Sequence, residues 1–163
     1  ASREVVIRSK IELNNEIRIV ENVESMQELE LAWDNYRFDE EDEYGIRFTQ
    51  EVFCYQVART NNLDFLKWAR EVKQCAWDEC PIIVAARLGN LEMVKYCVEN
   101  DCPMDASACA YAASEGHLAI LKYLREHGCP WDSETCRCAH MRNQIECLNY
   151  AIEQRCPGYE RFI

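Results

Sequence analysis

One cysteine returns at positions 75, 102, 129 and 156, and this spacing of 27 residues constrains the fold more than any other feature of the chain. The residues around the cysteine return with it. Gly128-Cys-Pro-Trp-Asp132 is matched 27 residues earlier by Asp101-Cys-Pro-Met-Asp105, and again by Cys75-Ala-Trp-Asp78. Self-similarity at a fixed period of this length is typical of a solenoid, in which each repeat packs on its neighbours.

Each repeat carries the pattern of two helices. In His117-Leu-Ala-Ile-Leu-Lys-Tyr-Leu124, three leucines at 118, 121 and 124 form one apolar stripe. A segment rich in Ala and Cys, Ala108–Ala113, precedes it, and small side chains let two helices approach closely. The pattern predicts four helix pairs: 50–60 with 62–73, 78–88 with 90–100, 105–115 with 117–127, and 133–143 with 144–155.

Local signals mark the ends of these helices. Asp78, Asp105 and Asp132 stand ahead of the first helices, where a carboxylate accepts hydrogen bonds from exposed amides. The step from Asn62 to Asn90 is 28 residues, one more than the period. We expect the extra residue to lengthen the helix that ends near Cys75.

Residues 1–47 do not fit the repeat and hold 13 acidic and 6 basic residues. Alternating apolar residues from Ile7 to Ile19 indicate a hairpin, and Ser25-Met-Gln-Glu28 indicates a capped helix reaching Trp33. Asp39–Glu43 reads as a solvated linker. We expect 1–47 to be an acidic end cap, 48–157 to be the repeat array, and 158–163 to be a tail or the start of a further repeat.

With the unit defined, the chain resembles the ankyrin family. Gly116–Cys129 is similar to the second half of an ankyrin repeat, and Cys80-Pro-Ile-Ile-Val-Ala-Ala86 is similar to its Thr-Pro-Leu-His-x-Ala-Ala opening. The Cys-Pro-Trp-Asp junction resembles a short variant of the family. The resemblance implies an all-α solenoid of stacked helix-turn-helix units acting as a protein-interaction scaffold. The family's projecting β-turn finger falls in the missing part of each unit, which shifts the expected contacts to the first helices.

In the ankyrin family, the positions after the small-residue core of the first helix face the concave groove. Here these positions are Arg59, Thr60, Arg87, Leu88, Ser114, Glu115, Met141 and Arg142. Their arginines, extended by Arg137 one turn earlier, would form a basic strip suited to the carboxylates of an acidic partner. The alternative is that they are ordinary solvated helix ends. Trp131 joins the candidate surface, either packed between successive loops or stacked on a ligand.

The eleven cysteines admit several interpretations. An odd number without an export signal favours reduced thiols packed in the core of an intracellular, cytoplasmic protein over a disulfide framework. Zinc is the competing interpretation, because Cys136-x-Cys138 and Cys97-x₄-Cys102 have ligand-like spacing. Structural zinc sites bring two such pairs together, whereas these occur singly or whole repeats apart. We therefore expect neither a metal nor a cofactor.

The net charge of the chain and its lack of catalytic motifs exclude several classes of function. The net charge of −11 disfavours nucleic acid and anionic membrane surfaces, and no apolar run approaches the length of a membrane span. Neither a nucleophile–base constellation nor a Gly-rich phosphate loop indicates an enzyme. We expect a monomeric, non-catalytic module that binds a protein or peptide. The alternative is a structural spacer or docking segment of a larger protein.

Chelation tests the zinc interpretation. If the cysteines are core residues, EDTA should leave the helical circular dichroism and the thermal midpoint of the full chain unchanged. Collapse of the helicity with EDTA would show that the fold depends on a metal.

Overall fold

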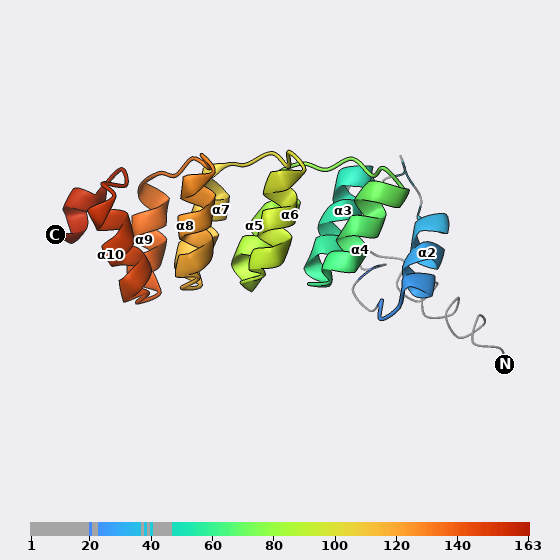
Figure 1. Ribbon diagram of the computed structural model, residues 1–163, viewed down its shortest axis with the longest axis horizontal. Helices are drawn as coiled ribbons and strands as arrows, with labels where there is room; N and C mark the ends of the chain where they lie inside the picture. The colour runs from blue at the N-terminus through green and yellow to red at the C-terminus, as the bar shows by residue number, and fades with distance from the viewer. Residues whose placement is uncertain (1–19, 21–22, 37, 39, 41–46) are drawn as a thin grey trace. The chain divides into compact units, whose positions relative to one another are not determined.

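The computed structural model describes residues 20, 23–36, 38, 40 and 47–163. The chain divides into two compact units, Ala1–Trp77 and Asp78–Ile163. The first contains α2 (Met26–Asp34), α3 (Gln50–Arg59), α4 (Leu63–Lys67) and the π-helix η1 (Trp68–Val72). The second contains α5 (Cys80–Leu88), α6 (Leu91–Glu99), α7 (Ala106–Ser114), α8 (Leu118–Glu126), α9 (Ser133–Met141), α10 (Ile145–Glu153) and the 3₁₀-helix η2 (Tyr159–Phe162) (Figure 1).

The regular elements of the described residues are all helical, which confirms the predicted all-α class. The eight helices of the predicted pairs are present, and their ends lie within two residues of the expected positions. The predicted hairpin from Ile7 to Ile19 lies outside the described residues, as does the Asp39–Glu43 linker apart from Glu40. The boundary at residues 47 and 48 stays a prediction.

The predicted capped helix before the array is α2. The Ser25 side chain accepts from the Glu28 amide at 3.3 Å, as the capping pattern requires. Trp33 lies near the end of α2, and its ring meets that of Phe53 on α3 edge-on, with centroids 5.0 Å apart. The non-repeat segment therefore packs an aromatic side chain against the first helix pair, as an end cap would.

The extra residue of the first repeat is taken up as a wider helical turn. The amide of Cys102 donates to the carbonyl of Cys97, five residues back, at 2.9 Å. The equivalent bond in the first repeat joins Cys75 to Ala69, six residues back, also at 2.9 Å. The intervening Trp68–Val72 segment is π-helical, so the helix is longer, as expected, without displacing the cysteine.

Residues with a left-handed backbone conformation, that is with positive φ, occupy the same two positions in every repeat. The first place, between the two helices, is held by Asn61, Gly89, Gly116 and Asn143, all with φ between 56° and 79°. The second, just before the recurring cysteine, is held by Gln74, Asp101, Gly128 and Arg155, with φ between 51° and 81°. Glycine and asparagine tolerate this conformation best, which explains why they dominate the first position.

In the second unit, the first helices α5, α7 and α9 pack on one another more extensively than α6, α8 and α10 do. Most of the fully buried residues of these helices are small, namely Ala85, Ala86, Ala108, Cys109, Ala112, Ala113, Cys136 and Ala139. Small side chains allow neighbouring backbones to approach closely, so the Ala- and Cys-rich segments do what the sequence predicted.

The recurring cysteines, here called the ladder cysteines, close each repeat. Cys75, Cys102, Cys129 and Cys156 are at most 4% exposed. Their thiols donate to backbone carbonyls at the start of the same repeat, on Gln50 (3.1 Å), Asp78 (3.3 Å), Asp105 (3.3 Å) and Asp132 (3.2 Å) respectively. Three of these acceptors are the predicted capping aspartates, whose carboxylates accept from Cys80, Ser107 and Glu134 amides at 2.9 to 3.0 Å. Asp105 and Asp132 are the N-caps of α7 and α9, as predicted, whereas the N-cap of α5 is Glu79, one residue after Asp78.

The buried thiols make the free energy of unfolding depend on pH in the alkaline range. Burial raises the pKa of the Cys156 thiol from about 9 to about 12, while the same thiol in the unfolded chain ionises near its ordinary value. The stabilisation is therefore complete below about pH 9 and is lost as the pH rises from there towards 12.

We expect the free energy of unfolding in urea to fall above pH 9, by up to about 1.4 kcal/mol per pH unit for each such thiol. Cys156→Ala should have the shallower slope, with Cys138→Ala, at a half-buried thiol, as the matched control. Equal slopes in wild type and Cys156→Ala would contradict the assignment.

Candidate functional site

The candidate site lies on the solvent side of α5, α7 and α9 and on the turn residues that follow them, here called the first-helix face. Residues 27 apart occupy equivalent positions on it. Arg87, Ser114 and Met141 hold one position, and Leu88, Glu115 and Arg142 hold the next. The arginines of this unit are therefore not one row, since Arg142 lies one position later than Arg87.

A cleft of about 300 Å³ opens between α7 and α9 on this face. It is hollow because α7 carries Ala110 where α5 carries Ile83 and α9 carries Arg137. Its lining residues are Ala106, Ser107, Ala110, Tyr111, Ser114, Asp132, Glu134, Arg137 and Cys138. Of the predicted surface residues, the structure thus brings Ser114 and Arg137 together at one cleft.

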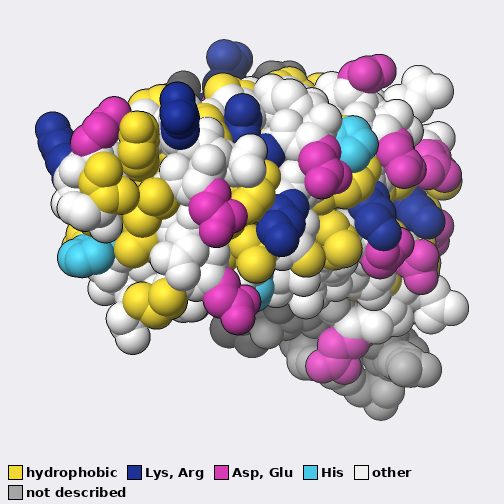
Figure 2. All heavy atoms as spheres, turned by 60° about the vertical axis from the view of Figure 1, so that its left-hand side comes forward, with side chains coloured by type: hydrophobic (Ala, Val, Ile, Leu, Met, Phe, Trp, Pro, Cys, Tyr) yellow, Lys and Arg dark blue, Asp and Glu magenta, His cyan; other side chains and the backbone are white. Residues whose placement is uncertain are grey.

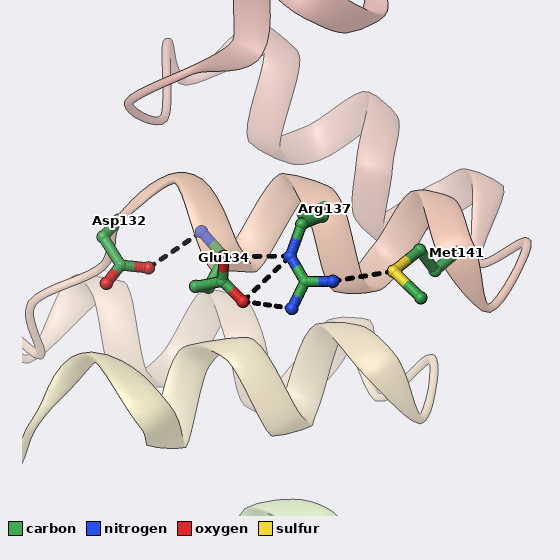
Figure 3. Close-up of polar contacts among 4 residues, drawn as sticks. All are labelled: Asp132, Glu134, Arg137 and Met141. Atoms are coloured by element: carbon green, nitrogen blue, oxygen red, sulfur yellow. Dashed lines mark hydrogen bonds and ion pairs between the residues drawn. The ribbon is translucent and has the colours of Figure 1, made fainter.

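Arg137 is engaged within its own helix (Figure 3). Its Nε donates to both carboxylate oxygens of Glu134 at 2.9 Å, and its Nη2 donates to Glu134 Oε2. Its Nη1 donates to Met141 Sδ at 2.8 Å. Hydrogen bonds from the guanidinium lower the pKa of Glu134 and raise that of Arg137, so the two groups neutralise each other as a pair.

Arg142 also has an acidic neighbour. Its Nη2 lies 3.9 Å from Glu115 Oε1, on the preceding repeat. The Arg87 side chain is exposed, and its backbone carbonyl accepts from His117 Nε2 at 3.2 Å. The predicted basic strip is therefore partly balanced by glutamates within the second unit.

Apolar side chains are exposed on the same face. Leu88 is 40% exposed, Tyr111 is 42% and Met141 is 68%. Tyr111 was not among the residues singled out from the sequence. The signal was available, because this large aromatic residue occupies the position of Val84 and Cys138 in the neighbouring repeats.

Trp131 is half-buried and has a partner that the sequence interpretation missed. The Arg125 guanidinium carbon lies 4.3 Å from the centre of its ring, and Arg125 Nη1 donates to the carbonyl of Cys129. Trp77 and Arg70 repeat the arrangement in the first unit, at 4.1 Å. The middle repeat has Val98 and Met104 at the positions of Arg125 and Trp131. Because both residues change together, the sequence already indicated that they are in contact. Packing thus occupies one face of the Trp131 ring.

The other predicted residues lie in the first unit. Arg59 is exposed, and its guanidinium carbon lies 5.7 Å from the centre of the Tyr55 ring. Thr60 caps α3, because its hydroxyl donates to the Val57 carbonyl at 2.7 Å and accepts from the Asn62 amide at 3.3 Å.

The surface chemistry is mixed. Figure 2, turned towards the C-terminal helices, shows acidic and basic side chains interspersed, with hydrophobic side chains reaching the surface between them. Across the described part of the chain, no three His, Cys, Asp or Glu side chains are grouped as metal ligands. Nor, in that part, does any helix have the length and apolar content needed to cross a bilayer.

Two comparisons with known proteins bear on the fold. A family model described as ankyrin repeats, three copies, matches residues 54–135. The match begins within α3 and ends at the start of α9, so it covers the whole of α7 and the first residues of α9. Curated proteins yield no match.

Exposed arginines should contribute little to folding. We expect Arg87→Ala and Arg142→Ala each to change the free energy of unfolding by less than about 1 kcal/mol, because solvent screens exposed ion pairs. Leu121→Ala is the contrasting control, since that side chain is fully buried on α8 and its loss should cost about 2–5 kcal/mol. Urea titration measures all three. A cost for either arginine comparable to that of Leu121→Ala would show that it is structural.

Proposed function

Since the chain belongs to the ankyrin-repeat family, whose repeats are generally protein-interaction modules, we propose that this protein binds a protein or peptide segment on its first-helix face. The binding involves no catalysis and no cofactor. None of the eleven cysteines forms a disulfide, which supports a reducing, cytoplasmic location. We propose in addition that the module works as a monomer.

The observation that carries this proposal is the coincidence of exposed apolar side chains with a cleft. Tyr111 lines the cleft, Met141 contacts Arg137 at its edge, and Leu88 lies on the neighbouring helix. Protein interfaces are enriched in aromatic, Met and Arg side chains, and all three kinds are present here. A rigid surface of packed helices also loses little conformational entropy when a partner binds.

The acidic partner suggested by the sequence stays a prediction. It rests on the arginines of the face, of which Arg137 and Arg142 already lie against Glu134 and Glu115. Arg87 remains its best support. Carboxylates on a partner would therefore have to compete with Glu134 and Glu115 for Arg137 and Arg142.

Peptides selected on the full chain from a displayed random library provide the test. We expect Tyr111→Ala combined with Met141→Ala to weaken the selected peptides at least tenfold in a titration by fluorescence anisotropy, because interface aromatic side chains typically carry much of the binding energy. Thermal midpoints should stay close to wild type, since both side chains are exposed.

The matched control is Ile145→Ala, an apolar side chain on α10 that is 53% exposed, against 68% for Met141. It should leave peptide affinity unchanged. Equal losses in both variants, or no peptide that depends on the first-helix face, would contradict the proposal and favour a spacer or docking segment of a larger protein.

A further inference from the structure

The cleft between α7 and α9 offers hydrogen-bond acceptors that no described residue uses. Asp132 uses one carboxylate oxygen to accept from the Glu134 amide at 2.9 Å, and its other oxygen has no partner among the described residues. The Ser107 hydroxyl donates a hydrogen bond to Asp105 Oδ2 at 3.1 Å, so its oxygen remains available as an acceptor. A ligand that supplies donors would therefore find acceptors in place.

A serine hydroxyl on the wall of the same cleft has no protein partner among the described residues. Ser114 is only 9% exposed and lines the cleft, yet within the described residues its hydroxyl makes no hydrogen bond. A polar group placed in the cleft would satisfy Ser114.

The net charge of the cleft indicates whether this polar group of the ligand is a cation or an anion. Its charged lining residues are Asp132, Glu134 and Arg137, so its net charge is negative. Each of the three guanidinium nitrogens of Arg137 already donates to Glu134 or Met141. A carboxylate would meet two carboxylates and compete for a guanidinium already in use, whereas a cation would meet acceptors and the exposed ring of Tyr111.

Resting on the proposed function, we infer that the cleft between α7 and α9 receives a basic side chain, lysine or arginine, from the bound protein segment. The aliphatic stem lies against Ala106 and Ala110, and the charged end reaches Asp132, Glu134 and Ser114. A volume of about 300 Å³ is at the low end for a ligand site, which suits one long side chain rather than a whole small molecule. The excess of acidic residues in 78–163, thirteen against eight basic, attracts such a segment over longer range.

Two reciprocal substitutions test the sign of the charge, with peptides selected on the full chain as probes. Glu134→Gln should weaken a selected peptide about three- to tenfold, and Arg137→Gln should leave it unchanged or strengthen it by a similar factor. Replacing the basic residue of the peptide by norleucine should weaken binding to wild type and abolish the difference between the two variants. The opposite pattern, Arg137→Gln weakening and Glu134→Gln strengthening, would overturn the inference in favour of an acidic side chain.

A filled cleft tests the location. Ala110→Leu places a larger side chain in the hollow and should weaken the peptide at least tenfold, while Ala119→Leu, on the exposed side of α8, should not. Peptides that depend on Tyr111 and Met141 but tolerate Ala110→Leu, or that need no basic residue, would overturn this inference and leave the proposed function standing. Failure to obtain any peptide bound to the first-helix face would overturn both.

Discussion

The bond from each ladder cysteine to the beginning of its own repeat is the interaction on which the rest of the arrangement depends. A thiol such as Cys129 sits just after the second helix, and its hydrogen bond to the Asp105 carbonyl ties that point to the start of the first helix. Free cysteine is among the most buried residue types, so the side chain fills core space while it donates this bond. The same aspartate caps the first helix with its carboxylate, so one residue joins the closure of the repeat to the start of its helix.

The hydrogen bonds of the ladder cysteines explain why the first-helix face is regular enough to bind a partner. In the second unit, α7 and α9 each start from an aspartate held in this way, and α5 begins two residues after the equivalent Asp78. A left-handed residue, Gly89, Gly116 or Asn143, follows each of these helices within two residues. Their buried residues are mostly small, which lets the helices pack closely, whereas their exposed residues differ between repeats. The cleft arises from one such variation, because Ala110 replaces the larger residues found at the equivalent positions of its neighbours.

The fold was readable from the sequence because its determinants recur at a fixed spacing. The 27-residue period, the apolar stripe through Leu118, Leu121 and Leu124, and the capping aspartates each appear several times, so one ambiguous copy is corrected by the others. The candidate site was only partly readable, because its features occur once. Nothing in the period indicated that Arg137 would pair with Glu134. The Arg125–Trp131 contact and the exposed Tyr111 were signalled only by departures of single repeats from the common pattern. The π-helical turn at Trp68–Val72 was signalled only as one extra residue, whose backbone conformation depends on keeping Cys75 in place.

The most direct test of the central claim is a map of backbone amide chemical shifts of the isotope-labelled full chain, recorded with and without a saturating selected peptide. If the repeats present their first helices as the binding surface, the perturbed amides should lie in α5, α7 and α9 and in the turns after them, and should centre on the cleft between α7 and α9. Perturbations that centre instead on α6, α8 and α10 would contradict the account.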